Sequence, residues 1–217
     1  MFKYKILLLC IVLFFIESIY IVKANTLPLI GKIIYIDPGH GGIDPGAIYK
    51  NMKESNINLE YAREIGNLLE HKGATIYYTR DGDYDLAIGS KRRKKSDLRN
   101  RVILLNNSNA DLYLSIHMNS ENTGLWYGSQ IFYNENNLNN KKIAQAIQND
   151  LKKNNISKRD ISIIKGLYMY ENITIPGVLI EVGFISNYSD RKKIESSEFM
   201  HKFSNILVGS IIKYFNN

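Results

Sequence analysis

The chain has 217 residues, of which 45% are hydrophobic and 23% charged, and its formal net charge is +7. This composition excludes disordered, collagen-like and polytopic membrane proteins, and the length suits one domain with a full hydrophobic core. The only cysteine, Cys10, lies in the N-terminal segment, so the rest of the chain offers no disulfide, thiolate zinc site or cysteine nucleophile.

The N-terminal segment Met1–Ala24 has the layout of an export signal. A basic start precedes the uninterrupted apolar run Ile6–Ile16, and Val22-Lys23-Ala24 places small or aliphatic residues where a signal peptidase reads. The run is shorter than the roughly 17–25 residues of a membrane-spanning helix. We therefore expect export, with residues 1–24 as a cleaved signal peptide or an uncleaved N-terminal anchor, and residues 25–217 as the functional domain.

The remainder alternates short β-branched runs with amphipathic stretches, which predicts strands and helices in turn. Polar or glycine-rich segments separate them. In chain order we expect a strand at Lys32–Ile36, a helix at Glu54–His71, a strand at Ala74–Thr79, a charged loop at Asp81–Lys95, a helix at Asp97–Asn107, strands at Asp111–Ile116 and Gln130–Tyr133, a helix at Asn139–Asn154, a strand at Gly177–Ile180 and a closing helix at Phe199–Phe215.

This alternation predicts an α/β fold, because strands that alternate with helices pair in parallel and are covered by those helices. We expect a single domain with a largely parallel twisted sheet and helices on both faces. No internal repeat or linker rich in proline and serine divides the chain.

Four residues stand where chemistry is expected in such a fold. His40 follows the first strand, His117 and Glu181 each end a later strand, and Glu54 opens the first helix. Ligands of open parallel sheets bind outside the carboxyl ends of the strands, so the four should converge on one rim. Two imidazoles and one carboxylate form the ligand set of a hydrolytic zinc site, and a further carboxylate supplies its general base.

Each of these residues also has a purely structural interpretation. A histidine in a turn or at a strand end can satisfy backbone carbonyls, and a glutamate that opens a helix favours the helix dipole. Glu181 is less easily explained in this way, because a carboxylate directly after Val-Leu-Ile is buried and needs a partner. The other two histidines, His71 and His201, are interpreted as structural or surface residues.

Other kinds of active site find less support. The sequence has no Gly-x-Ser-x-Gly elbow, no phosphate-binding loop and no dinucleotide fingerprint. Ser115 is expected to pack rather than to react. The cationic run Lys91–Lys95 predicts a solvated loop face or contact with an anionic wall polymer or lipid, and nucleic acid is not expected as a partner of an exported protein. Trp126 and Tyr127 form either an exposed aromatic lip for sugar or peptide, or loop packing.

At these motifs the sequence resembles zinc-dependent N-acetylmuramoyl-L-alanine amidases of the Amidase_3 family. The resemblance runs from about Ile33 to the C-terminus, and the order of its motifs makes it specific. They are Ile36–Gly42 with Asp44–Gly46, Glu54 with Asn58-Leu59, Thr79–Asp81, Arg101-Val102, Asn106, Ala110–Asn119 and Pro176–Asn187.

The resemblance implies that His40, Glu54 and His117 bind zinc (Zn2+) and that Glu181 is the catalytic glutamate. It also implies the bond cleaved, which is the amide between N-acetylmuramic acid and L-alanine of the peptidoglycan stem peptide. In its small size and its lack of wall-binding repeats, the chain resembles the sporulation branch of the family. Members of that branch remove stem peptides from the peptidoglycan of the spore cortex. This removal is a step toward muramic-δ-lactam, which germination enzymes recognise.

Several consequences follow as expectations. The protein would act outside the cytoplasm, in the cell wall or the spore intermembrane space, and without a binding module it would need an accessory envelope protein. No stable oligomer is expected. The alternatives are another zinc-dependent wall hydrolase, such as a peptidase or deacetylase, a non-catalytic peptidoglycan-binding protein, and an exported structural or adhesion protein.

Overall fold

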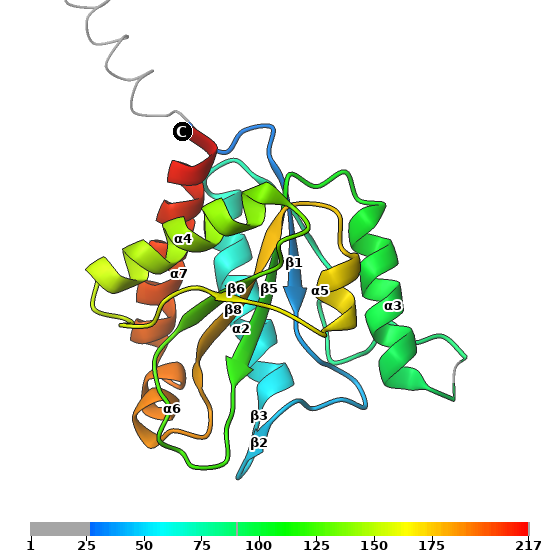
Figure 1. The fold of residues 1–217 in the computed structure, drawn as a ribbon, viewed down its shortest axis with the longest axis vertical. Helices are drawn as coiled ribbons and strands as arrows, with labels where there is room; N and C mark the ends of the chain where they lie inside the picture. Colours follow the sequence, from blue (N-terminus) through cyan, green and yellow to red (C-terminus); the bar gives the residue numbers. More distant parts are fainter. Residues whose placement is uncertain (1–26, 90, 217) are drawn as a thin grey trace, which may run out of the picture.

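The computed structural model describes residues 27–89 and 91–216 (Figure 1). The predicted signal peptide or anchor, Met1–Ala24, lies outside these residues. Among the described residues, no helix is both long enough and apolar enough to cross a membrane.

Six strands form one sheet in the order β4-β1-β5-β8-β6-β7. The first four of these pair in parallel, β6 is antiparallel to β8, and β7 is parallel to β6. A separate short hairpin, β2–β3, lies directly before helix α2. The strands are β1 (Ile33–Pro38), β2 (Ile48–Tyr49), β3 (Met52–Lys53), β4 (Thr75–Tyr78), β5 (Leu112–Asn119), β6 (Gln130–Tyr133), β7 (Ser162–Ile163) and β8 (Gly177–Phe184).

Helices cover both faces of the sheet, which confirms the predicted α/β class (Figure 1). Helices α2, α4 and α7 pack on one face, and α3 and α5 lie on the other. The helices are α2 (Glu54–Glu70), α3 (Arg93–Asn106), α4 (Leu138–Lys153), α5 (Tyr168–Asn172), α6 (Tyr188–Ile194) and α7 (Ser197–Asn216).

The alternation of side chains along the strands divides the core into two clusters. Ile34 and Ile36 of β1 join the larger cluster beneath α2, α4 and α7, whereas Tyr35 joins the smaller cluster beneath α3 and α5. Burying each isoleucine or leucine stabilises the fold by about 1.5–3 kcal/mol. Because successive residues point to opposite faces, the polar residues near the strand ends are also assigned to one face each.

The predicted boundaries of β5 and β8 are too short. Both strands continue past their predicted ends, to Asn119 and Phe184, so His117 and Glu181 lie inside strands rather than at their ends. The physical reason is that Met118 and Val182 continue the apolar alternation on the opposite face, where both are buried. At this end of the two strands, the face that carries His117 and Glu181 turns polar beyond the smaller core cluster, while the opposite face remains core.

The prediction of a charged loop up to Lys95 is also wrong at its C-terminal end, because α3 begins at Arg93. Arg93 pairs with Asp85 at 2.8 Å between Nη2 and Oδ1, and Lys94 pairs with Asp44 at 2.9 Å between Nζ and Oδ1. These acids offset the repulsion within the cationic run, which allows its second half to enter a helix. Part of the run is thus committed to contacts within the chain.

Candidate metal centre

His40 is carried by the tight turn that follows β1. Its own φ is +61°, a left-handed conformation that is costly for a residue with a side chain and needs support from its surroundings. Two buried arginines provide that support. Arg80 donates to the carbonyls of Pro38 and Gly39, both at 2.9 Å, and Arg101 donates to the carbonyl of His40 at 2.7 Å. The turn is therefore held by charged donors that reach it from elsewhere in the chain.

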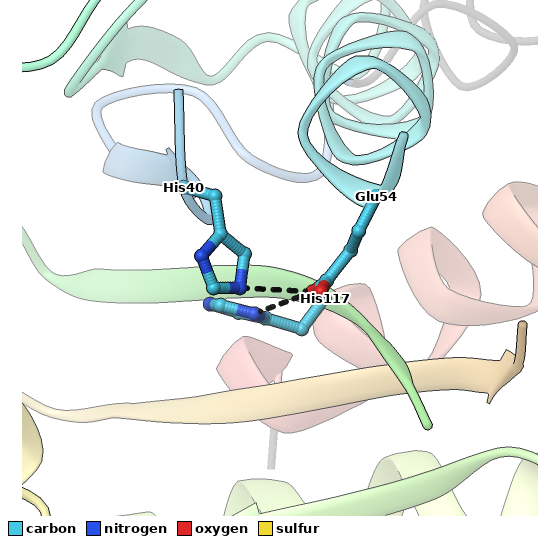
Figure 2. Close-up of side chains that lie close together, drawn as sticks. All are labelled: His40, Glu54 and His117. Atoms are coloured by element: carbon cyan, nitrogen blue, oxygen red, sulfur yellow. Dashed lines mark hydrogen bonds and ion pairs between the residues drawn. The ribbon is translucent and has the colours of Figure 1, made fainter. Parts of the chain in front are cut away.

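Figure 2 shows that one carboxylate oxygen of Glu54 meets a ring nitrogen of each of the two predicted histidines. Its Oε1 is 3.2 Å from His40 Nε2 and 3.0 Å from His117 Nδ1. One ligand atom from each of the three residues can be chosen so that all lie within 4.8 Å of one another. The structure thus brings together two imidazole nitrogens and a carboxylate oxygen, a donor set that suits a divalent cation of the zinc type.

The Glu54 carboxylate is fixed by backbone and side-chain donors. Oε2 accepts a hydrogen bond from the Ala47 amide at 2.8 Å, and Oε1 accepts from the Met118 amide at 3.2 Å and from Asn58 at 3.3 Å. Burial by itself would raise the pKa of Glu54, but hydrogen bonds with His117 and His40 outweigh it and hold that pKa well below the usual range. Glu54 therefore stays ionised, as a metal ligand must.

Each histidine is oriented through its other ring nitrogen. His40 Nδ1 is 3.1 Å from Asp44 Oδ2, and His117 Nε2 is 3.4 Å from the hydroxyl of Tyr170 on α5. Burial by itself would lower the pKa of His40. The hydrogen bonds and negative charges of Glu54 and Asp44 outweigh this effect, so the pKa of His40 is raised above its ordinary value. A carboxylate behind a histidine is the arrangement that fixes the ring and its tautomer in metal sites.

Two glycines allow the three ligands to come this close. A Cβ added at Gly39 would lie 2.1 Å from His117 Nε2, and one added at Gly46 would lie 2.5 Å from Glu54 Oε2. Neither position can hold a larger residue unless a ligand side chain moves. The glycines of the His40 region thus make room for the neighbouring ligand side chains.

Glu181 lies beside His117, its register partner on the adjacent strand. Its Oε2 has no hydrogen-bond partner among the described residues, although the atom is buried. Burial, followed by the nearby negative charge of Glu54, raises the pKa of Glu181 to about 8. A carboxylate with a raised pKa and an oxygen without a partner has the proton affinity needed for a general base or acid.

These residues open into a cavity of about 260 Å³ on the α3 and α5 side of the sheet. His40, His117 and Glu181 line it, together with Leu98 of α3 and Tyr168 of α5. Three hollows elsewhere on the described surface are larger, but none of the three is lined by a predicted site residue. The cavity therefore marks where the reacting part of a substrate can sit.

The sequence predictions name four residues that the structure brings together, but they do not name the residues that support them. Asp44 and Arg101 fall within the motifs that carry the family resemblance, so those motifs are a signal for them. Tyr170 gives no signal, since it lies in a five-residue helix that the sequence pattern does not predict. His71 and His201 are exposed, as expected, and His201 pairs with Glu64 at 2.7 Å.

Comparisons with known proteins agree with this geometry. The sequence model of the family Amidase_3, described as N-acetylmuramoyl-L-alanine amidase, matches residues 34–213. The chain is 42% identical over 198 residues to the germination-specific N-acetylmuramoyl-L-alanine amidase of Bacillus subtilis, with 89% of this chain and 84% of the relative covered. The matched span of the family model contains the whole donor set and Glu181.

Solved structures of N-acetylmuramoyl-L-alanine amidases share the fold of this chain. The CwlD amidase from Clostridioides difficile, in complex with the GerS lipoprotein, superposes with a TM-score of 0.81 at 32% identity, covering 86% of this chain and 99% of that one. An N-acetylmuramoyl-L-alanine amidase from Clostridium difficile 630 gives a TM-score of 0.76 at 27% identity, covering 86% and 97%.

Proposed function

The chain belongs to the Amidase_3 family of N-acetylmuramoyl-L-alanine amidases, and from that premise we propose that it acts on the peptidoglycan of the spore cortex. An amidase of this family hydrolyses the amide that joins N-acetylmuramic acid to the L-alanine of the stem peptide. The similarity to the germination-specific amidase supports the cortex as the place of action. The product there would be glycan without stem peptides, a step toward muramic-δ-lactam.

The observation that carries this proposal is the convergence of His40, Glu54 and His117 beside the unpartnered oxygen of Glu181. These three residues would hold zinc. When bound, zinc supplies a Lewis acid that activates water and polarises the amide carbonyl. The donor set fits it, because each histidine presents a ring nitrogen toward Glu54 and the carboxylate is ionised.

Glu181 moves the proton in this scheme. As a carboxylate it accepts a proton from the attacking water, and as an acid it returns that proton to the departing alanine amine. Its pKa of about 8 would leave it mostly protonated at neutral pH. A divalent cation held by His40 and Glu54 would lower that pKa, because a nearby positive charge favours the ionised form.

We further propose that the protein works outside the cytoplasm, in the cell wall or the spore intermembrane space. The basic and apolar layout of Met1–Ala24 supports export. The CwlD amidase, a structural neighbour, was solved in complex with the GerS lipoprotein, which supports an accessory envelope protein as a partner here too.

One experiment tests this function directly. Purified protein is incubated with cortex peptidoglycan, with and without a chelator, and the products are identified by mass. We expect free stem peptides that begin with L-alanine, formed only when metal is present. Cleavage inside the stem peptide or loss of acetyl groups would contradict the proposed bond, and binding without any product would indicate a non-catalytic wall protein.

A further inference from the structure

An exposed apolar segment lies beyond the site, between β5 and β6. Leu125, Trp126 and Tyr127 are 75%, 56% and 61% exposed, three large apolar side chains in succession. Figure 1 shows the segment between β5 and β6 at the same end of the molecule as the β2–β3 hairpin. Apolar side chains presented together at one end of a site mark a binding surface more often than isolated ones do.

The backbone of this segment is held in place on both sides. Asn187 donates to the carbonyl of Gly124 at 2.8 Å, and the Gly128 amide donates to Asp190 at 2.7 Å. Within the segment, the Trp126 amide donates to Glu121 at 3.3 Å. The side chains are therefore presented by a fixed backbone.

Arg159 orders the indole ring of Trp126 from one side. Its guanidinium carbon is 4.8 Å from the centre of the Trp126 ring and also 4.8 Å from the centre of the Phe184 ring. Arg159 Nε also donates to the carbonyl of Tyr127 at 2.8 Å. A cation stacked on one side of an indole leaves the rest of the ring as a rigid, amphipathic platform.

A continuous row of polar residues connects this platform to the catalytic glutamate. Glu181 is the register partner of His117 on one side and of Gln130 on the other, so the three side chains share one face of the sheet. Gln130 Oε1 in turn accepts from Arg159 Nη1 at 3.0 Å. The row runs from the metal centre across β8 and β6 to the guanidinium under Trp126.

The cavity beneath α3 and α5 and the exposed surface around Trp126 suit different parts of a substrate. The cavity of about 260 Å³ lies between the sheet and helices α3 and α5, and it has room for a short side arm. A glycan strand continues in both directions past each muramic acid, so it needs an open surface. On the Trp126 side the side chains of Leu125, Trp126 and Tyr127 are exposed, and an indole face stacks well on the apolar face of a pyranose ring.

We propose that Leu125, Trp126 and Tyr127, with Arg159 beneath the indole, form a glycan-binding surface that holds the sugar strand while the amide lies at Glu181. This inference rests on the proposed function, because it takes the substrate to be a glycan with peptide side arms. The hydrogen bond from Arg159 to Gln130 fixes the guanidinium between the indole of Trp126 and strand β8, which carries Glu181.

The chain provides its own probe for this surface. Trp126 is the only tryptophan in the sequence, so intrinsic tryptophan emission reports on it alone. Full chain carrying Glu181→Ala is titrated with glycan strands from which the stem peptides have been removed. We expect a saturable change in emission, weakened at least fivefold by Arg159→Ala and unchanged by Lys158→Ala, an exposed neighbour of the same charge.

This titration needs no turnover, so its outcome is separate from that of the cortex assay. An unchanged emission with glycan would overturn the proposal, as would a change produced by free stem peptide but not by glycan. Binding of a purified envelope protein to this surface, with no response to glycan, would assign it to a protein partner instead.

Kinetics provide a second, independent test. Trp126→Ala should raise the KM for polymeric peptidoglycan at least fivefold, Lys158→Ala should leave that KM unchanged, and Trp126→Phe should restore most of the affinity. Because the side chain is exposed, the variant should keep its thermal melting temperature. Equal KM values for the variant and the natural chain on polymer would contradict a glycan-binding role.

Discussion

Two polar clusters lie close together at the carboxyl end of the sheet, and they differ in how completely their hydrogen bonds are satisfied. In the first, Asp37 accepts from Thr79 at 2.6 Å and Arg101 at 2.7 Å through one oxygen, and from Ser115 at 2.6 Å through the other. In the second, Glu181 keeps a buried oxygen without a partner among the described residues, and so does Asn58.

The difference separates support from chemistry. Buried polar groups are normally all hydrogen-bonded, so the cluster of Asp37, in which both carboxylate oxygens have partners, is explained by a structural role. An unsatisfied buried oxygen costs about 1–3 kcal/mol, so one that lies in a candidate site needs an explanation, such as a ligand or a proton that it receives. We therefore expect changes in the first cluster to affect stability and changes in the second to affect metal binding and activity.

The largest effect is expected from His117→Ala. With one imidazole removed, two ligands remain, and we expect metal affinity to fall by more than the roughly 10–100-fold that loss of an outer hydrogen-bond partner costs. Metal content measured after dialysis, together with lytic activity, checks this. His201→Ala is the matched control, since that histidine is exposed and lies on α7. Retention of metal by the His117 variant would remove it from the ligand set.

Glu181→Gln should lower kcat by about 100–10,000-fold, the usual contribution of a general base, while metal content stays the same. The amide keeps the shape of the carboxylate but cannot accept the proton. Release of stem peptides from cortex peptidoglycan is the measurement, and Glu60→Gln on the exposed surface of α2 is the control. A variant that remains active would exclude Glu181 as the base.

Arg101→Met should destabilise the fold by about 3–5 kcal/mol, because it leaves the buried Asp37 charge without its partner. The turn that carries His40 would also lose a donor to its carbonyl. Denaturant unfolding of metal-free protein gives the free energy of unfolding. Arg99→Met, exposed on the same helix, should change it by less than about 0.5 kcal/mol. Similar losses in both variants would show that the buried pair contributes nothing specific.

The smallest expected effect is a dependence of stability on acid pH. Burial raises the pKa of Asp37, but Arg101, Ser115 and Thr79 outweigh it and lower that pKa below its ordinary value. The folded state therefore gains stability above the unfolded pKa of about 3.9, and this gain is lost as pH falls through the lower pKa of the folded state. Unfolding free energies between pH 7 and pH 3, in chelator, should fall less steeply for Asp37→Asn, and parallel curves would contradict the assignment.

Local patterns predict the fold class correctly, and they name residues that the structure brings together. The buried face of an element determines where its apolar residues recur, and this spacing is visible in the sequence. Examples are the apolar runs of β1 and β8 and the helical spacing of Ile57, Tyr61 and Ile65. His40, His117 and Glu181 are found because each interrupts or follows such a run. The strand ends are missed, since on one face Met118 and Val182 continue the core while the opposite face turns polar.

The tertiary structure decided which groups support the site. Arg101 and His40 are far apart in the chain, and only the packing of α3 against the sheet brings the guanidinium to the His40 carbonyl. Likewise, α5 places Tyr170 behind His117, and Arg159 reaches Trp126 from a different segment. Periodicity reports burial along one element, whereas hydrogen-bond partners depend on distances between elements. The sequence alone thus determined the layers of the fold and the types of donor in the site. The tertiary structure brought these donors close to one another, and their charge state and orientation depend on that proximity.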